Sequence, residues 1–169
     1  MKKIFFFFLF ILFFNSNSKA DIAYIDIDLI LNKSKVGKFL NNYVDEINSK
    51  NISRYTKVEN RLLEKEQLLI AQQNILNKEE FEKQFTNLSK EVQTFRTEKR
   101  ASLEKLKKFK IENTKEILKV LNPIITNYVN FKSISIVIPK KNIIVGKKNL
   151  DITDDIIELL DKDIQKLNF

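Results

Sequence analysis

Glycine and proline are missing from the whole middle of this 169-residue chain, and their absence most constrains its fold. No glycine lies between Gly37 and Gly146, and no proline lies between Ala20 and Pro123. Because these residues interrupt helices, about a hundred positions are free to form helix. Apolar residues there recur three, four or seven positions apart between charged ones, which is typical of a coiled coil. They include Val36, Leu40, Tyr43, Ile47, Tyr55, Val58, Leu62, Leu69, Phe81, Phe85, Leu88, Val92 and Phe95.

The apolar stripe is interrupted once, between Gln72 and Asn77. Asn77 is a favourable N-cap residue, and Glu80 stands three positions later, where a capping box has its acid. The sequence therefore predicts an antiparallel helical hairpin over residues 38–122 with its turn near 72–77. One arm, residues 38–73, would be about 54 Å long and would project from the rest of the molecule.

Antiparallel pairing places Val58 opposite Phe95 and Ile47 opposite Leu106. Between these two pairs, large apolar side chains are scarce on both arms. One hypothesis is a flexible waist, since little apolar area would hold the arms together there. The alternative is an ordinary solvated stretch of helix. The waist residues would be Asn48, Asn51, Lys99 and Ser102.

The first twenty residues have the pattern of a secretory signal peptide. Lys2 and Lys3 precede an apolar run from Ile4 to Phe14, and small residues follow, so cleavage is expected after Ala20. The alternative, a membrane anchor, is disfavoured because eleven residues form a helix of only about 17 Å.

Short β-branched runs lie at both ends of the remaining chain. Residues 21–26 predict a strand, residues 134–145 a strand hairpin, and residues 153–167 a final helix capped by Thr153. Together with the arm, this gives an α+β, mainly α fold, with a small body built from residues 21–37 and 123–169. A core of this size is rarely stable below about 70–80 residues, so we expect the body to oligomerise.

The composition argues against an enzyme. The chain has no His and no Cys, so a conventional zinc site or a Ser/His or Cys/His pair cannot form. Two isolated glycines cannot build a phosphate-binding loop. We therefore expect no catalytic residues, no metal site and no cofactor. The acids around Thr153 are better explained as favourable charges at a helix N-terminus.

Several segments resemble the Skp/OmpH family of periplasmic chaperones. The resemblance spans the chain after residue 20 and is most specific at Leu150–Ile157, Leu-Asp-Ile-Thr-Asp-Asp-Ile-Ile. It implies a homotrimer whose strands form a barrel-like body carrying three arms. It also implies a periplasmic location and ATP-independent binding of unfolded outer-membrane proteins. Other matching segments are Ile22–Asp26, Ser34–Lys38, Leu76–Phe81 and Asn122–Ile124, and the strand residues expected in the trimer body are Tyr24, Ile25, Ile136, Ile138, Ile143 and Val145.

The charges suggest how such clients could be attracted. Residues 101–122 carry six basic and three acidic groups, and residues 123–150 carry five basic groups and no acid. Lys105, Lys107, Lys108 and Lys110 are candidates for steering acidic clients, although a solvated helix face explains any one of them more simply. Phe81, Phe85 and Phe95 are assigned to packing within the hairpin.

Three other kinds of partner compete with unfolded clients as interpretations of the sequence. A sequence pI of about 9.5 raises nucleic acid, but export and the intermixed acids argue against it. A surface of anionic lipid or lipopolysaccharide is a candidate for a further partner, bound alongside the clients. The main alternative function is a structural coiled-coil adaptor of the cell envelope that binds one folded partner.

Overall fold

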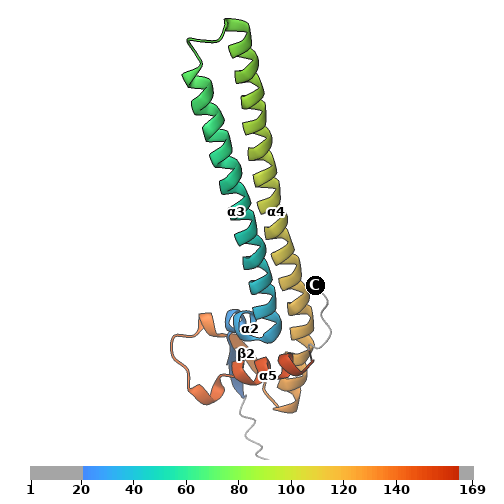
Figure 1. Ribbon diagram of the computed structural model, residues 1–169. Helices are drawn as coiled ribbons and strands as arrows, with labels where there is room; N and C mark the ends of the chain where they lie inside the picture. The colour runs from blue at the N-terminus through green and yellow to red at the C-terminus, as the bar shows by residue number, and fades with distance from the viewer. Residues whose placement is uncertain (1–20, 164–169) are drawn as a thin grey trace, which may run out of the picture.

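Two long antiparallel helices project from a small body of short elements (Figure 1). The computed structural model describes residues 21–163. Helices α3 (Lys35–Ala71) and α4 (Lys78–Phe131) form the hairpin and are about 56 and 81 Å long. The α+β, mainly α fold class is thus confirmed. The body contains β1 (Ile22–Ile25), α2 (Ile27–Lys33), β2 (Ile136–Pro139), the 3₁₀ turns η2 (Lys140–Asn142) and η3 (Lys148–Leu150), and α5 (Thr153–Asp163).

The predicted signal peptide and the end of the predicted final helix, residues 164–167, lie outside the described residues.

The hairpin turn lies between Ala71 and Lys78, and Asn77 caps the second helix. The Asn77 Oδ1 atom accepts a hydrogen bond from the backbone N–H of Glu80 at 2.9 Å. The Glu80 carboxylate in turn accepts a hydrogen bond from the Asn77 side-chain amide at 3.1 Å. Glu79 and Glu80 also place negative charge in the first turn of α4, where the helix dipole favours it.

At the base of the arm, the chain bends sharply from α2 into α3 around Ser34. The buried Ser34 hydroxyl accepts from the backbone N–H of Gly37 at 3.2 Å and so caps α3. Gly37 lies so close to α2 that a Cβ atom there would come 1.9 Å from the Leu31 carbonyl oxygen. Only glycine permits this approach, which sets the angle between the arm and the body.

The sheet joins the two ends of the chain. Strands β1 and β2 pair in parallel, with Ile22 opposite Ile136 and Ile25 opposite Pro139. Parallel strands need a long crossover, and here the whole helical hairpin supplies it. The predicted strand hairpin over residues 134–145 is therefore wrong. Residues 140–142 form a 3₁₀ turn, and residues 143–145 are not a strand, because β1 rather than this second run supplies the hydrogen-bond partners of β2.

Thr153 has a different role from the predicted helix cap. It is the first residue of α5, and its buried hydroxyl accepts from the backbone N–H of Asp26 at 2.9 Å while donating to the Asp151 carboxylate at 2.5 Å. Lys140 also donates to Asp151, at 2.9 Å. Burial of the Asp151 carboxyl opposes its ionisation, but the hydrogen bonds from Thr153 and Lys140 outweigh burial and lower its pKa below the ordinary value. This network joins the end of β1 to the start of α5.

The core of the molecule is in the body, where the base of the arm meets the sheet and α5. Its most buried side chains come from α2, α4 and α5, so these helices are held together by apolar contact. The buried residues of this cluster are Ala23, Ile25, Ile30, Val36, Leu40, Ile117, Leu121, Ile124, Ile152, Ile156 and Leu160.

Candidate functional site

The seam of the arm is a narrow heptad contact. Tyr55, Leu62 and Leu69 are buried on α3 at intervals of seven residues, as in a two-stranded coiled coil. Tyr55 meets Phe95 of α4 with ring centroids 6.1 Å apart, and Tyr43 meets Phe109 at 5.3 Å. These contacts fall within a few residues of the pairing predicted from the sequence.

Two ion pairs cross the hairpin beside the seam. The Lys65 Nζ atom lies 2.6 Å from a Glu91 carboxylate oxygen, and Lys99 Nζ lies 2.6 Å from Glu59. The hydrogen bond from Lys65 lowers the pKa of Glu91 below its ordinary value. These exposed pairs each contribute little stability, but together with the seam they fix the register of the arms.

On one side of the seam, the distal arm carries a groove of about 930 Å³ that we call the apolar groove. Its floor is the seam, and its rims carry exposed apolar side chains. Polar and charged residues also line it: Glu59, Glu66, Ser89, Gln93, Arg96, Lys99 and Arg100. Leu63 and Ile70 stand on the α3 rim, while Phe85 and Leu103 stand on the α4 rim. Phe85 is 57% exposed, so its predicted role in packing is wrong. Phe81 and Phe95 are half-buried in the same groove.

The opposite side of the seam is polar. Two smaller hollows there share Leu62, Leu69, Leu88 and Phe95 with the apolar groove, but their rims are charged or polar. Leu68 is the exposed apolar side chain among them. The polar rim residues are Arg54, Arg61, Lys65, Gln72, Gln84, Asn87, Lys90, Glu91, Thr94 and Glu98. The groove side of the distal arm therefore carries more apolar side chains than the opposite side.

The four candidate steering lysines do not form one patch. Lys105, Lys107, Lys108 and Lys110 are all exposed, but at 3.6 residues per turn they point to different sides of α4. Lys108 also lies 3.8 Å from Glu112 on the same helix. The structure thus places four cations around the arm rather than on one surface.

The four candidate waist residues are all half-buried, and both helices run unbroken past them. No α3 side chain between Leu40 and Tyr55 is fully buried, so apolar packing is thin along this stretch. Lys99 differs from the other three. Besides its ion pair with Glu59, its ammonium lies 5.7 and 5.9 Å from the Tyr55 and Phe95 ring centroids, so it belongs to the seam.

The predicted body-strand residues have two different environments. Tyr24 and Ile25 are buried in β1, and Ile138 is half-buried in β2. Ile136 is half exposed at the surface of β2. Ile143 and Val145 lie outside the sheet, and Val145 is 88% exposed beside the fully exposed Ile144. Ile22, Ile136, Ile144 and Val145 thus give the body an exposed apolar surface.

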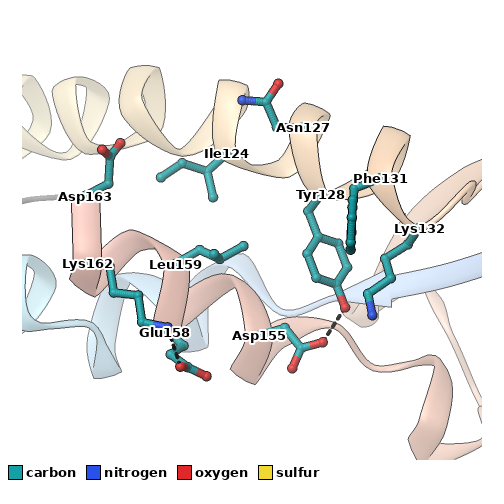
Figure 2. A pocket seen from close by; sticks show the side chains of 10 residues that line it. All are labelled: Ile124, Asn127, Tyr128, Phe131, Lys132, Asp155, Glu158, Leu159, Lys162 and Asp163. Carbon is teal, nitrogen blue, oxygen red and sulfur yellow. Dashed lines mark hydrogen bonds and ion pairs between the residues drawn. The ribbon is translucent and has the colours of Figure 1, made fainter.

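A second cleft, of about 820 Å³, lies between α4 and α5. Figure 2 shows Tyr128 of α4 pointing toward Asp155 of α5, with Phe131 and Lys132 beside it. Tyr128 donates a hydrogen bond to Asp155. Partial burial of the hydroxyl and the neighbouring carboxylate raise the pKa of Tyr128 to about 12. The cleft mixes apolar side chains with acids and lysines.

Neither a metal site nor a membrane-spanning helix is found in residues 21–163. Acidic side chains there do not gather in threes in a way that could bind a metal ion. No helix within that range has an apolar stretch long enough to span a bilayer.

Comparison with known proteins identifies the family to which this combination of arm and body belongs. A family model described as outer membrane protein (OmpH-like) matches residues 21–160. The chain belongs to the OmpH-like family. A similar solved structure is a candidate outer membrane chaperone (OmpH-like) from Caulobacter crescentus CB15, with a TM-score of 0.78 and 16% identity over 91% of each chain. No relative among the curated proteins matches the sequence.

In this OmpH-like chain, the rims of the apolar groove were not predicted from the sequence. The signal was present, because Leu63 and Ile70 directly follow the seam residues Leu62 and Leu69. They form a second heptad stripe, rotated by about 100° from the first. A two-helix seam covers only a narrow apolar stripe. When the stripe is wider, one edge stays exposed, and here that edge is the α3 rim of the groove.

Proposed function

We propose that this chain is an ATP-independent holdase chaperone of the periplasm. Its clients are unfolded outer-membrane β-barrel proteins, which it keeps soluble for delivery to the outer membrane. Membership of the OmpH-like family supports this proposal, as does the arm that projects far from the body. The alternative, an adaptor that binds one folded partner, does not require an apolar surface along the arm.

The observation that carries the proposal is the apolar groove. A chaperone without a chemical release step must bind its clients through many weak contacts. Leu63, Ile70, Phe85 and Leu103 offer separate apolar contacts along several helical turns. Side chains on one face of an extended segment repeat about every 6.6 Å, so a barrel strand could place several of them along such a groove.

We also propose that three copies assemble through their bodies. Within the described residues, β2 is hydrogen-bonded to β1 alone, so its other edge is open to a strand from another copy. Open edges and exposed apolar residues such as Ile136 and Ile144 favour association. Three bodies joined in this way would hold three arms around one client.

The test dilutes a urea-unfolded outer-membrane porin into buffer containing residues 21–169 and follows light scattering. We expect the protein to suppress the scattering from porin aggregates, and this suppression should reach its maximum near one trimer per porin. Leu63→Glu and Phe85→Glu together should abolish most of this suppression, because charge in the apolar groove disfavours apolar contact. Leu68→Glu is the matched control, since Leu68 is similarly exposed on the same helix as Leu63 but faces the polar side.

Two outcomes would contradict the proposal. If scattering stays unchanged at severalfold excess of folded protein, the holdase is wrong and the adaptor becomes the better interpretation. If Leu68→Glu weakens suppression as much as the groove variant does, the apolar groove is not where clients bind.

A further inference from the structure

Most charged and polar side chains of the α4/α5 cleft already have partners within the cleft. Tyr128 donates a hydrogen bond to Asp155, and Lys162 Nζ lies 2.6 Å from a Glu158 carboxylate oxygen. The Lys132 ammonium lies 5.8 Å from the centroid of the Tyr128 ring, within the range of a cation–π contact. A ligand recognised by its charge would have to compete with these contacts, so the cleft favours an apolar occupant.

The apolar side chains of the cleft are in contact with water. Phe131 is 82% exposed and Leu159 is 37% exposed, and both line the cleft. The cleft extends along α5 from Asp155 to Asp163, a length of about 12 Å. Figure 2 shows Asp163 at the end of the cleft near Ile124. A nearby apolar segment that covered Phe131 and Leu159 would therefore gain the free energy of removing them from water.

The residues that follow α5 have the composition and the length to do this. Residues 164–169 are Ile-Gln-Lys-Leu-Asn-Phe, with three large apolar side chains and no acid. They start at the cleft, because Asp163 itself lines it. Six extended residues reach at most about 20 Å, so they can return along the whole cleft to Phe131. Covalent attachment also gives them an effective concentration on the order of millimolar, which a partner from solution would have to exceed.

A straight continuation of α5 would give these side chains less cover. Figure 2 shows α5 running antiparallel to α4, so a longer α5 would extend past the part of α4 that contains Ile117. The α4 residues four and seven positions before Ile117 are Asn113 and Lys110, both polar. Leu167 on a longer α5 would therefore meet polar partners, whereas the cleft offers apolar ones.

We propose that residues 164–169 turn back at the end of α5 and cover the α4/α5 cleft of their own chain. Leu167 and Phe169 would pack on Leu159 and Phe131 and shield them from water. The contact holds α5 against α4 and leaves the cleft unavailable to clients. Neither the trimer nor the holdase activity proposed above is required for this contact.

The first test uses the absence of native cysteine from the chain. Asn127 lines the cleft, so Asn127→Cys is combined with Asn168→Cys in residues 21–169 and the protein is oxidised. Lys35→Cys with Asn168→Cys is the matched control. The Lys35 backbone N–H donates to the Asp161 carboxylate at 2.7 Å, so Lys35 lies beside the end of α5 but outside the cleft. We expect the Asn127 pair to form an intrachain disulfide at least tenfold faster than the Lys35 pair.

Two results of this test would overturn the proposal. Equal rates for the two pairs would mean that residues 164–169 visit both sides of α5 without preference, and a cleft pair that forms no disulfide would mean that they do not reach the cleft. A mixture of ordinary and ¹⁵N-labelled chains shows which chain supplies the segment. We expect both linked peptides to carry the same label. Links between a labelled and an unlabelled peptide would assign the cleft to another copy and contradict a contact within one chain.

The second test places a fluorescent reporter in the cleft, since the chain has no tryptophan. Phe131→Trp keeps a large aromatic side chain at this position. Adding Leu167→Ser with Phe169→Ser should move the tryptophan emission to longer wavelength and raise its quenching by acrylamide at least twofold, because the ring loses its cover. Gln165→Ser with Asn168→Ser is the control and should change neither quantity. If the Leu167→Ser and Phe169→Ser changes leave emission and quenching unchanged, residues 164–169 do not cover Phe131 and the proposal is wrong.

Discussion

Gly146 packs against the ring of Tyr24 so closely that a Cβ atom at Gly146 would come 2.7 Å from Tyr24 Cε1. Gly146 does not need a backbone conformation that only glycine adopts, because no glycine in the described residues has a positive φ angle. Gly146→Ala should therefore act through steric overlap alone. Since the ring is buried, we expect a loss of about 1–3 kcal/mol in the free energy of unfolding, measured by urea denaturation.

Asn149→Ala is the matched control for this variant. Asn149 lies in the same loop and is exposed, so its replacement should change the midpoint little. If Gly146→Ala is as stable as Asn149→Ala, the loop can move away from Tyr24 without cost.

Thr153→Val tests the junction between β1 and α5. Valine has the shape of threonine but leaves the Asp26 backbone N–H without its acceptor, so we expect a cost of about 1–3 kcal/mol. Thr153→Ser keeps the hydroxyl and should retain most of the stability. Thermal or urea unfolding of both variants decides the matter. Equal stability of the serine and valine variants would show that the hydroxyl contributes nothing.

Tyr128 should give the protein a distinct response to alkali. Its pKa is about 12 in the folded chain against an ordinary 10.0, so its contribution to stability is complete below pH 10 and is lost as the pH rises through 12. Phenolate absorbance during an alkaline titration should show a late step from Tyr128. Tyr128→Phe should remove that step. A late step that survives in Tyr128→Phe would assign it to another tyrosine.

Replacing the four candidate steering lysines with glutamine should change association rates more than affinity. Long-range attraction accelerates encounter and is screened by salt, so the rate constant for porin binding should fall and lose part of its salt dependence. Stopped-flow fluorescence at two salt concentrations measures this effect. The quadruple variant is Lys105→Gln, Lys107→Gln, Lys108→Gln and Lys110→Gln; identical rates in both proteins would remove these lysines from the mechanism.

The waist should appear in hydrogen exchange. We expect amides at 48–54 and 97–103 to exchange faster than those at 58–69 and 85–95, because fewer apolar contacts resist opening there. Asn51→Leu with Ser102→Leu adds apolar contact across the arms and should slow exchange locally. Equal protection of both regions in the unmodified protein would mean that the arm is uniformly stiff.

The hairpin could be predicted because its determinants are local. Heptad spacing at Tyr55, Leu62 and Leu69, missing glycines and the Asn77 cap all act over a few residues. The seam then follows from antiparallel pairing, with Tyr55 against Phe95 instead of the expected Val58. Such a shift of less than one turn is set by side-chain packing, which periodicity does not determine.

The body could not be predicted in the same way. A β-branched run such as Ile143–Val145 favours extended structure, but propensity does not select a partner strand. The parallel pairing of β1 with β2 depends on how the long hairpin returns to its base, which is a property of the whole chain. The apolar groove was missed for a related reason, since Phe85 matches the seam pattern yet lies outside the contact.

The parallel sheet limits the order in which the chain can fold. Ile22 pairs with Ile136, 114 positions later, so a chain that emerges N-terminus first cannot pair β1 until nearly all of it has appeared. The residues of both α3 and α4 emerge before those of β2. During this interval β1 remains an unpaired apolar strand, the kind of segment that aggregates most readily. A copy that has not yet completed its sheet would itself need shielding, and completed copies nearby could provide it.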